Sequence, residues 1–239
     1  MDDQKPLMQT PEEHRLEAEL RVCDPEKVGR AKEIEEARVM RMGTELAEGF
    51  ALLRKYRLGA TFFGSARCSI GDDIYESARA LAEKLAQSGF AIITGGGGGV
   101  MEAANKGAYE VEGGMSVGLN IKLPHEQIPN GYVTESKTFN YFFSRKVILT
   151  FAAEVYIYFP GGFGTFDELF EILTLIQTKK IKQVPVVLYG KIFWEPVISL
   201  LKKHLLEAYK TVDEADLSLF KVVDSVEEAH TYILDSVRC

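Results

Sequence analysis

Residues 155–165 read Val-Tyr-Ile-Tyr-Phe-Pro-Gly-Gly-Phe-Gly-Thr, so an apolar run leads directly into a glycine-rich turn. A short apolar run bounded by proline and glycine is typical of a buried β-strand. The residues that follow, 165–177, have the spacing of an amphipathic helix. This order of strand, glycine-rich turn and helix is the unit from which parallel sheets are built.

The same alternation continues on both sides of this segment. Nearly continuous apolar runs predict strands at 60–63, 91–94, 116–119, 132–135, 154–159, 184–188 and 221–223. Amphipathic segments predict helices at 74–88, 100–109, 140–151, 165–177, 194–208 and 225–235. We therefore predict an α/β Rossmann-like fold, a doubly wound parallel sheet with helices on both faces.

The first 57 residues differ from the rest of the chain. They carry 13 acidic and 11 basic side chains and only three glycines. No proline interrupts residues 26–57, and apolar residues recur every three to five positions, at Ile34, Val39, Met42, Leu46, Phe50 and Leu53. We predict an N-terminal helical extension, 1–57, and a nucleotide-binding catalytic domain, 58–239. The apolar stripe must be buried either against the core or against another subunit.

Composition limits the classes of partner. The 239 residues hold 28 basic and 35 acidic side chains, a net charge of −7, which argues against nucleic-acid binding. No apolar run is long enough for a membrane span, and the polar, acidic start is unlike a signal peptide, so we expect a cytoplasmic protein with no membrane partner. The three cysteines and four histidines show no ligand spacing, so we expect no metal and no cofactor.

Glycine-rich turns follow three of the predicted strands. Residues 64–67 are Gly-Ser-Ala-Arg, residues 95–99 are five glycines, and residues 160–165 are Pro-Gly-Gly-Phe-Gly-Thr. Backbone N–H groups at helix starts bind phosphate, so these turns predict a phosphorylated ligand. A dinucleotide fingerprint is excluded because Val100 stands where it needs glycine or alanine. A P-loop is excluded because Ile192 follows the Gly190-Lys191 pair.

Charged residues near these turns have two interpretations each. Thr165 and Glu168 form a capping box at a helix start in one interpretation. In the other, Glu168 projects into the pocket, and the helix dipole keeps its carboxylate ionised. Arg145 and Lys146 form either a surface pair or a salt bridge, or else a buried arginine offers its planar fork to a phosphate or a leaving group. Asp167 is a weaker second acid.

Residues 160–168 match the P-G-G-x-G-T-x-x-E motif, and with Ser144-Arg145-Lys146, Gly64-Ser65 and the polyglycine turn the sequence resembles the Lonely Guy (LOG) family over residues 58–235. It is similar to the longer bacterial members, in which a proline usually stands where this chain has Gly98. The resemblance implies a cytokinin riboside 5′-monophosphate phosphoribohydrolase, which releases free base and ribose 5-phosphate from N6-modified AMP, with many bacterial members also acting on AMP. It implies catalytic roles for Arg145 and Glu168. The residues assigned to substrate binding are Ser65, Gly96, Gly97, Gly98, Gly99, Lys146, Gly161, Gly162, Gly164 and Thr165.

The resemblance also implies a homo-oligomer, a dimer or larger, whose small-molecule partner is a nucleoside monophosphate. Cleavage of the N-glycosidic bond builds positive charge on the ribose, which the carboxylate of Glu168 would stabilise. Phe142, Phe143 and Phe163 are candidates for the walls of the base pocket. The alternatives are a non-catalytic nucleotide or cofactor carrier or sensor, as in related carriers of molybdenum cofactor, and a structural protein. The lysine-decarboxylase label that the family has carried finds no support in these residues.

Overall fold

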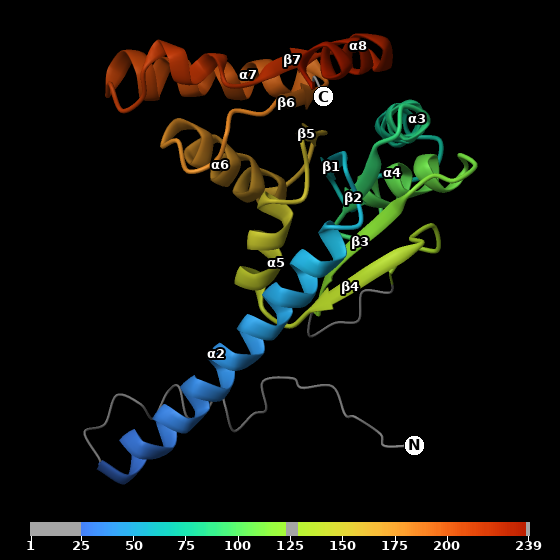
Figure 1. The fold of residues 1–239 in the computed structure, drawn as a ribbon. Helices are drawn as coiled ribbons and strands as arrows, with labels where there is room; N and C mark the ends of the chain where they lie inside the picture. Colours follow the sequence, from blue (N-terminus) through green and yellow to red (C-terminus); the bar gives the residue numbers. More distant parts are fainter. Residues whose placement is uncertain (1–24, 123–128, 238–239) are drawn as a thin grey trace.

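A computed structural model describes residues 25–122 and 129–237, and in this part of the chain seven strands form one parallel sheet (Figure 1). The strands, in chain order, are β1 Gly59–Phe63, β2 Ala91–Thr94, β3 Ser116–Ile121, β4 Glu135–Phe139, β5 Val155–Tyr158, β6 Val186–Tyr189 and β7 Lys221–Val223. Their order across the sheet is β4-β3-β2-β1-β5-β6-β7. This arrangement confirms the predicted fold class.

Helices connect the strands and cover both faces of the sheet. They are α2 Pro25–Leu53, α3 Asp73–Gln87, α4 Val100–Tyr109, α5 Phe142–Thr150, α6 Phe163–Gln177, α7 Lys191–Leu201 and α8 Val226–Ser236. The helix predicted at 194–208 is α7 followed by a π-helical segment, Lys202–Ala208, and a 3₁₀ turn, Glu214–Ser218, precedes β7. Among the described residues, no helix is long and apolar enough to cross a membrane.

Two apolar cores lie on opposite faces of the sheet because successive strand side chains point to opposite sides. Phe62 and Ile157 pack with α3, α4 and α8 on one face. Phe63 and Tyr156 pack with α2, α5, α6 and α7 on the other. Strands buried on both faces have continuous apolar sequences, which is why the sequence pattern located most of them.

The exception is β4, which the apolar run placed at 132–135 and the structure places at Glu135–Phe139. Within the described part of the chain, this strand pairs only with β3, at the edge of the sheet. Ser136 and Thr138 are exposed, whereas Phe139 is fully buried. Because four of the five residues of β4, Glu-Ser-Lys-Thr-Phe, are polar, a search for apolar runs misplaces this strand.

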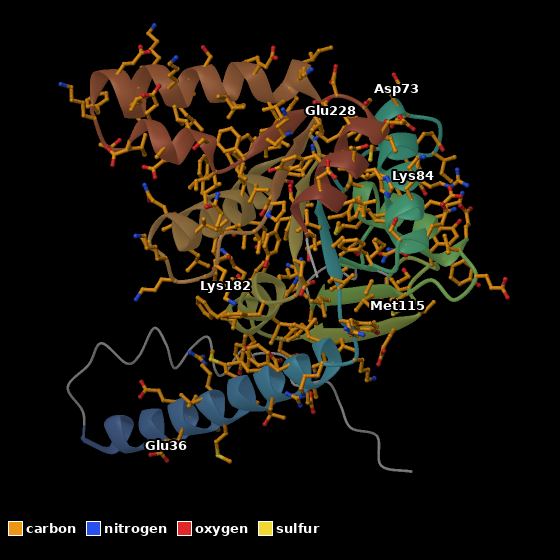
Figure 2. All side chains as sticks on the ribbon, turned by 45° about the horizontal axis from the view of Figure 1, so that its top comes forward. Glu36, Asp73, Lys84, Met115, Lys182 and Glu228 are labelled. Atoms are coloured by element: carbon orange, nitrogen blue, oxygen red, sulfur yellow. The ribbon has the colours of Figure 1, made fainter. Side chains whose placement is uncertain are left out.

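The C-terminal half of α2 belongs to the core, and its N-terminal half extends away from the sheet (Figure 1). Of the predicted stripe, Leu46, Phe50 and Leu53 pack against the core, whereas Val39 is 67% exposed. Figure 2 shows Glu36 on the extended half. The stripe is therefore docked only in part, and the portion of the predicted extension at 1–24 lies outside the described residues.

The chain order reverses at β1, which pairs with β2 on one side and β5 on the other. Ligands of open α/β sheets bind beyond the carboxyl ends of the strands at such a switch point. The residues at this point are the loop after Phe63 and the loop after Tyr158.

Candidate functional site

A cavity of about 580 Å³ lies at this switch point. Its walls come from the end of β1 and the loop after it, from α5 and from the first two turns of α6. The residues that line it are Phe62, Phe63, Gly64, Ser65, Ala66, Arg67, Gly95, Met101, Phe142, Arg145, Gly162, Phe163, Gly164, Thr165, Asp167 and Glu168. A cavity of this size is in the range of small-molecule sites.

Hydrogen bonds fix the loops around the cavity to one another. The N–H of Ser65 donates to the carbonyl of Pro160 at 3.0 Å, and the carbonyl of Ser65 accepts from the N–H of Val100 at 2.9 Å. A Cβ at Gly161 would lie 2.1 Å from Thr165 Oγ1, so glycine is needed where these loops meet. Gly161 supports the turn without lining the cavity.

The N-terminus of α6 opens into the cavity. Gly162 is its N-cap, and no side chain caps the helix. The capping-box interpretation of Thr165 and Glu168 is therefore wrong, because the helix begins at Phe163 rather than after Thr165. The first N–H groups of a helix have no partner within it, so this end of α6 can bind an anion.

Glu168 lies in the second turn of α6 and is only 8% exposed. Burial raises its pKa to about 7, while the positive charges of Arg145 and Lys146 oppose that shift. The expectation that the helix dipole keeps this carboxyl fully ionised is wrong, because the loss of hydration outweighs the favourable charges. Near neutral pH, Glu168 can act as a carboxylate or as a proton donor.

Arg145 reaches the cavity from α5, and its Nε donates to the carbonyl of Leu119 at 2.9 Å. Its Nη2 lies against Gly95, where an added Cβ would be 2.6 Å away. Burial lowers the pKa of Arg145, and the nearby charge of Glu168 raises it. The arginine is thus a buried cation in the cavity wall and not part of a surface pair.

The polyglycine turn is tightly packed, and Gly95 is its only residue in the cavity lining. Gly96 and Gly99 have φ of 71° and 67°, which favours glycine. The N–H of Gly96 donates to Thr94 Oγ1 at 2.9 Å, and Asn130 binds the carbonyls of Gly96 and Gly97. The structure does not bring the predicted ligands Gly96, Gly97, Gly98 and Gly99 to the cavity wall.

Lys146 is also outside the cavity lining. Its Nζ lies 2.9 Å from Asp167 and 3.3 Å from Glu171. These carboxylates raise the pKa of Lys146 against the lowering effect of burial. Lys146 therefore pairs with two carboxylates of α6, whereas the sequence analysis assigned it to substrate binding.

Arg67, Gly95 and Met101 line the cavity without having been assigned a catalytic or binding role, although Arg67 and Gly95 belong to glycine-rich turns that predicted a phosphorylated ligand. Arg67 follows the first predicted strand, at the carboxyl edge of the sheet, and this position could have identified it from the sequence as a candidate site residue. Phe142 and Phe163 line the cavity as suggested, and Phe143 does not. Among the described residues, no group of three potential ligands could hold a metal ion.

A parallel α/β sheet with an open helix N-terminus and a buried carboxyl at its switch point defines a Rossmann-like protein with a cavity at the carboxyl ends of its strands. A family model described as "Possible lysine decarboxylase" matches residues 101–233, which include Arg145 and Glu168. The chain belongs to this family, the LOG family that the motif indicates. No lysine is found among the residues lining the cavity.

Three relatives show the extent of the similarity. An uncharacterized protein of Archaeoglobus fulgidus is 31% identical over 137 residues, 56% of this chain and 85% of that protein. A cytokinin riboside 5′-monophosphate phosphoribohydrolase of Mycobacterium marinum is 30% identical over 43% of this chain and 55% of that protein. The rice cytokinin riboside 5′-monophosphate phosphoribohydrolase LOG is 27% identical over 58% of this chain. The chain thus spans little more than half the length of these two named relatives, 55% and 57%.

Solved structures support the fold. The molybdenum cofactor carrier protein of Chlamydomonas reinhardtii has a TM-score of 0.56 at 23% identity, covering 75% of this chain and 97% of its own. The molybdenum cofactor binding protein of Rippkaea orientalis has a TM-score of 0.54 at 22% identity, covering 74% and 94%.

Proposed function

We propose that the protein hydrolyses the N-glycosidic bond of adenosine 5′-monophosphate or an N6-modified form of it, releasing free base and ribose 5-phosphate. The observation that carries this proposal is the gathering of Arg145, Glu168 and the uncapped N-terminus of α6 around one cavity. The names of the M. marinum and rice relatives support the same reaction.

In the proposed complex, the phosphate binds at the N-terminus of α6, near the N–H groups of Phe163, Gly164 and Thr165. Anions are stabilised there by the helix dipole and by N–H groups that the helix leaves unpaired. Met101, Phe142 and Phe163 offer apolar surface for a purine ring, and all three line the cavity. The ribose then lies between these two regions, within reach of Glu168.

The reaction breaks the bond between ribose C1′ and the base nitrogen, and the electron pair leaves with the base. The oxygen of a water molecule bonds to C1′, and the proton balance is completed by protonation of the base. The carboxylate of Glu168 stabilises the positive charge that builds on the ribose. Because its pKa is about 7, Glu168 can also exchange a proton during the same cycle. Arg145, a permanent cation, stabilises electron density on the departing base.

The experiment compares the parent protein with Glu168→Gln and Asp167→Asn on AMP and N6-isopentenyl-AMP, with free base measured by chromatography. We expect base release by the parent, a loss of at least about a hundredfold in Glu168→Gln, and activity within a few-fold in Asp167→Asn. Asp167 is a matched control because it neighbours Glu168 on α6 and lines the cavity but is exposed. Tight binding without turnover would instead support the carrier or sensor alternative.

We also propose that the protein forms a homo-oligomer through the face of α5 beside the cavity. Phe143 and Phe151 are 72% and 58% exposed there, and Phe163, at the start of α6, is 97% exposed. Large apolar side chains that are this exposed can mark interaction surfaces. Light scattering on the parent and on Phe143→Glu tests this: an oligomer that the substitution dissociates supports the proposal, and a monomeric parent contradicts it.

A further inference from the structure

We propose that Arg67 binds the phosphate of the substrate and makes the site select phosphorylated nucleosides over nucleosides. The inference rests on the proposed function and names the residue responsible for one part of its specificity. Arg67 lies in the loop after β1, lines the cavity and is exposed. Nothing in the sequence motif or in the relatives' names assigns it this role.

The loop that carries Arg67 is held close to the start of α6. The N–H of Arg67 donates to Ser65 Oγ at 3.1 Å, which fixes the turn before the side chain. The N–H of Ser65 in turn donates to the carbonyl of Pro160, two residues before the N-cap of α6. A Cβ at Gly161 would lie 3.1 Å from the carbonyl carbon of Gly64. The backbone that carries Arg67 is therefore packed against the entry to α6.

The same loop is also packed against the start of α4. A Cβ at Gly99, the N-cap of α4, would lie 2.2 Å from the carbonyl oxygen of Ser65 and 2.7 Å from Cα of Ala66. No side chain caps α4 at this end. Arg67 thus directly follows Ala66, which lies against the N-terminus of α4. The same loop is packed against the entry to α6. The N-terminus of α6, which has no side-chain cap, favours negative charge, so this corner of the cavity attracts an anion.

The charged residues that line the cavity are Arg67, Arg145, Asp167 and Glu168. Asp167 is paired with Lys146. Arg145 is held by the carbonyl of Leu119 and lies close enough to Glu168 for each to shift the pKa of the other. Among the described residues, Arg67 forms no ion pair with a carboxylate. Its guanidinium is therefore available for a phosphate, which arginine binds through two parallel hydrogen bonds.

The consequence is a difference between AMP and adenosine. Arg67 contacts only the phosphate, so its loss weakens binding of AMP and leaves adenosine unaffected. Since Arg67 is remote from the bond that breaks, the loss appears in KM rather than in kcat. Charge-assisted hydrogen bonds of this kind change affinity by about ten- to a hundredfold.

The test measures kcat and KM of the parent, Arg67→Ala, Arg67→Lys and the control Arg54→Ala with AMP and with adenosine. Arg54 is an exposed arginine near the end of α2 and is not among the residues lining the cavity. We expect Arg67→Ala to raise KM for AMP at least tenfold with kcat changed less than threefold, and Arg67→Lys to give an intermediate KM. For adenosine, kcat/KM stays as in the parent. An unchanged KM for AMP in Arg67→Ala, or an equal loss with adenosine, would overturn the assignment.

Direct binding separates this proposal from the proposed function. Calorimetry with AMP, adenosine and ribose 5-phosphate is run on the same four proteins, whether or not any of them turns over. We expect the parent to bind AMP more tightly than adenosine and Arg67→Ala to lose most of that difference. A parent that binds AMP in this way without hydrolysing it contradicts the proposed hydrolysis and leaves the role of Arg67 supported. Equal AMP affinity in the parent and in Arg67→Ala contradicts the role of Arg67, even if hydrolysis is observed.

Discussion

Glu168 on α6 and Arg145 on α5 line one cavity without forming a salt bridge with each other, although each shifts the pKa of the other. Arg145 instead donates through Nε to the carbonyl of Leu119. In a direct ion pair, each charge would offset the other, and Glu168 would stay ionised. Their separation leaves both available to a ligand and allows the pKa of Glu168 to rise to about 7.

The raised pKa of Glu168 predicts a pH-dependent effect of Glu168→Gln on stability. The folded protein holds this proton more tightly than the unfolded chain, so the favourable contribution is complete below pH 4.5 and is lost as pH rises through 7. Relative to the parent, Glu168→Gln should gain roughly 2–3 kcal/mol in unfolding free energy between pH 5 and pH 8.5. Urea unfolding at both pH values measures this. A difference that stays constant with pH contradicts the raised pKa.

Substitutions at Lys146 should shift the pKa of Glu168 in a known direction. Its positive charge lowers the pKa of Glu168, so Lys146→Met should raise this pKa further, and Lys146→Arg should leave it nearly unchanged. Titration of the Glu168 carboxyl carbon by NMR, assigned by comparison with Glu168→Gln, reads this shift without relying on activity. A lower Glu168 pKa in Lys146→Met would be inconsistent with the geometry around Asp167 and Glu171.

The polyglycine turn predicts opposite outcomes for neighbouring glycines. A Cβ at Gly98 would lie 3.6 Å from the nearest atom, the carbonyl oxygen of Ala66, so Gly98→Ala fits and should change stability by less than about 1 kcal/mol. Gly99 has φ of 67° and no room beside the carbonyl of Ser65, so Gly99→Ala should destabilise by about 2 kcal/mol or more. Thermal unfolding of both variants measures this. Equal melting temperatures for the two would contradict the described packing of the turn.

Glu45 predicts a structural role for the N-terminal helix in the site. Its buried carboxylate accepts hydrogen bonds from Asn140 N–H at 2.7 Å, Asn140 Nδ2 at 2.9 Å and Tyr141 N–H at 3.4 Å, at the start of α5. Glu45→Ala leaves these donors unpaired and should destabilise by about 2–3 kcal/mol.

The matched control on the same helix is Glu48→Ala, which removes an ion pair with Lys137 that is exposed on the Glu48 side. Exposed ion pairs contribute about 0–1 kcal/mol, so this variant should remain close to the parent in urea unfolding. If both variants lose the same stability, Glu45 does not hold the start of α5 in the way that the hydrogen bonds indicate.

Much of the fold could be predicted because strands buried on both faces have a simple sequence pattern. The predicted ranges 91–94 and 221–223 coincide with β2 and β7, and 100–109 coincides with α4. The edge strand β4 was misplaced because four of its five residues are polar. The start of α6 was placed two residues late because Thr165 resembles an N-cap, while the actual N-cap, Gly162, has no side chain to signal it.

The site could be predicted less completely because its chemistry depends on contacts between distant segments. Arg145 and Glu168 were found by motif, and the structure brings both to the cavity. The pKa of Glu168 depends on its burial and on charges from α5, neither of which the local sequence of α6 contains. Lys146 resembled a ligand in the sequence, but its two carboxylate partners become visible only when α5 and α6 pack together.

The most direct test of the proposed function measures free base and ribose 5-phosphate together, in one reaction of the parent protein with AMP, alongside the affinity of Glu168→Gln for AMP. We expect the two products in equal amounts from the parent. We also expect a loss of at least about a hundredfold in kcat for Glu168→Gln, with AMP still bound. Unequal products, or base release by Glu168→Gln at the parent's rate, would contradict the proposed function, as would a parent that binds AMP and releases no base from AMP or N6-isopentenyl-AMP.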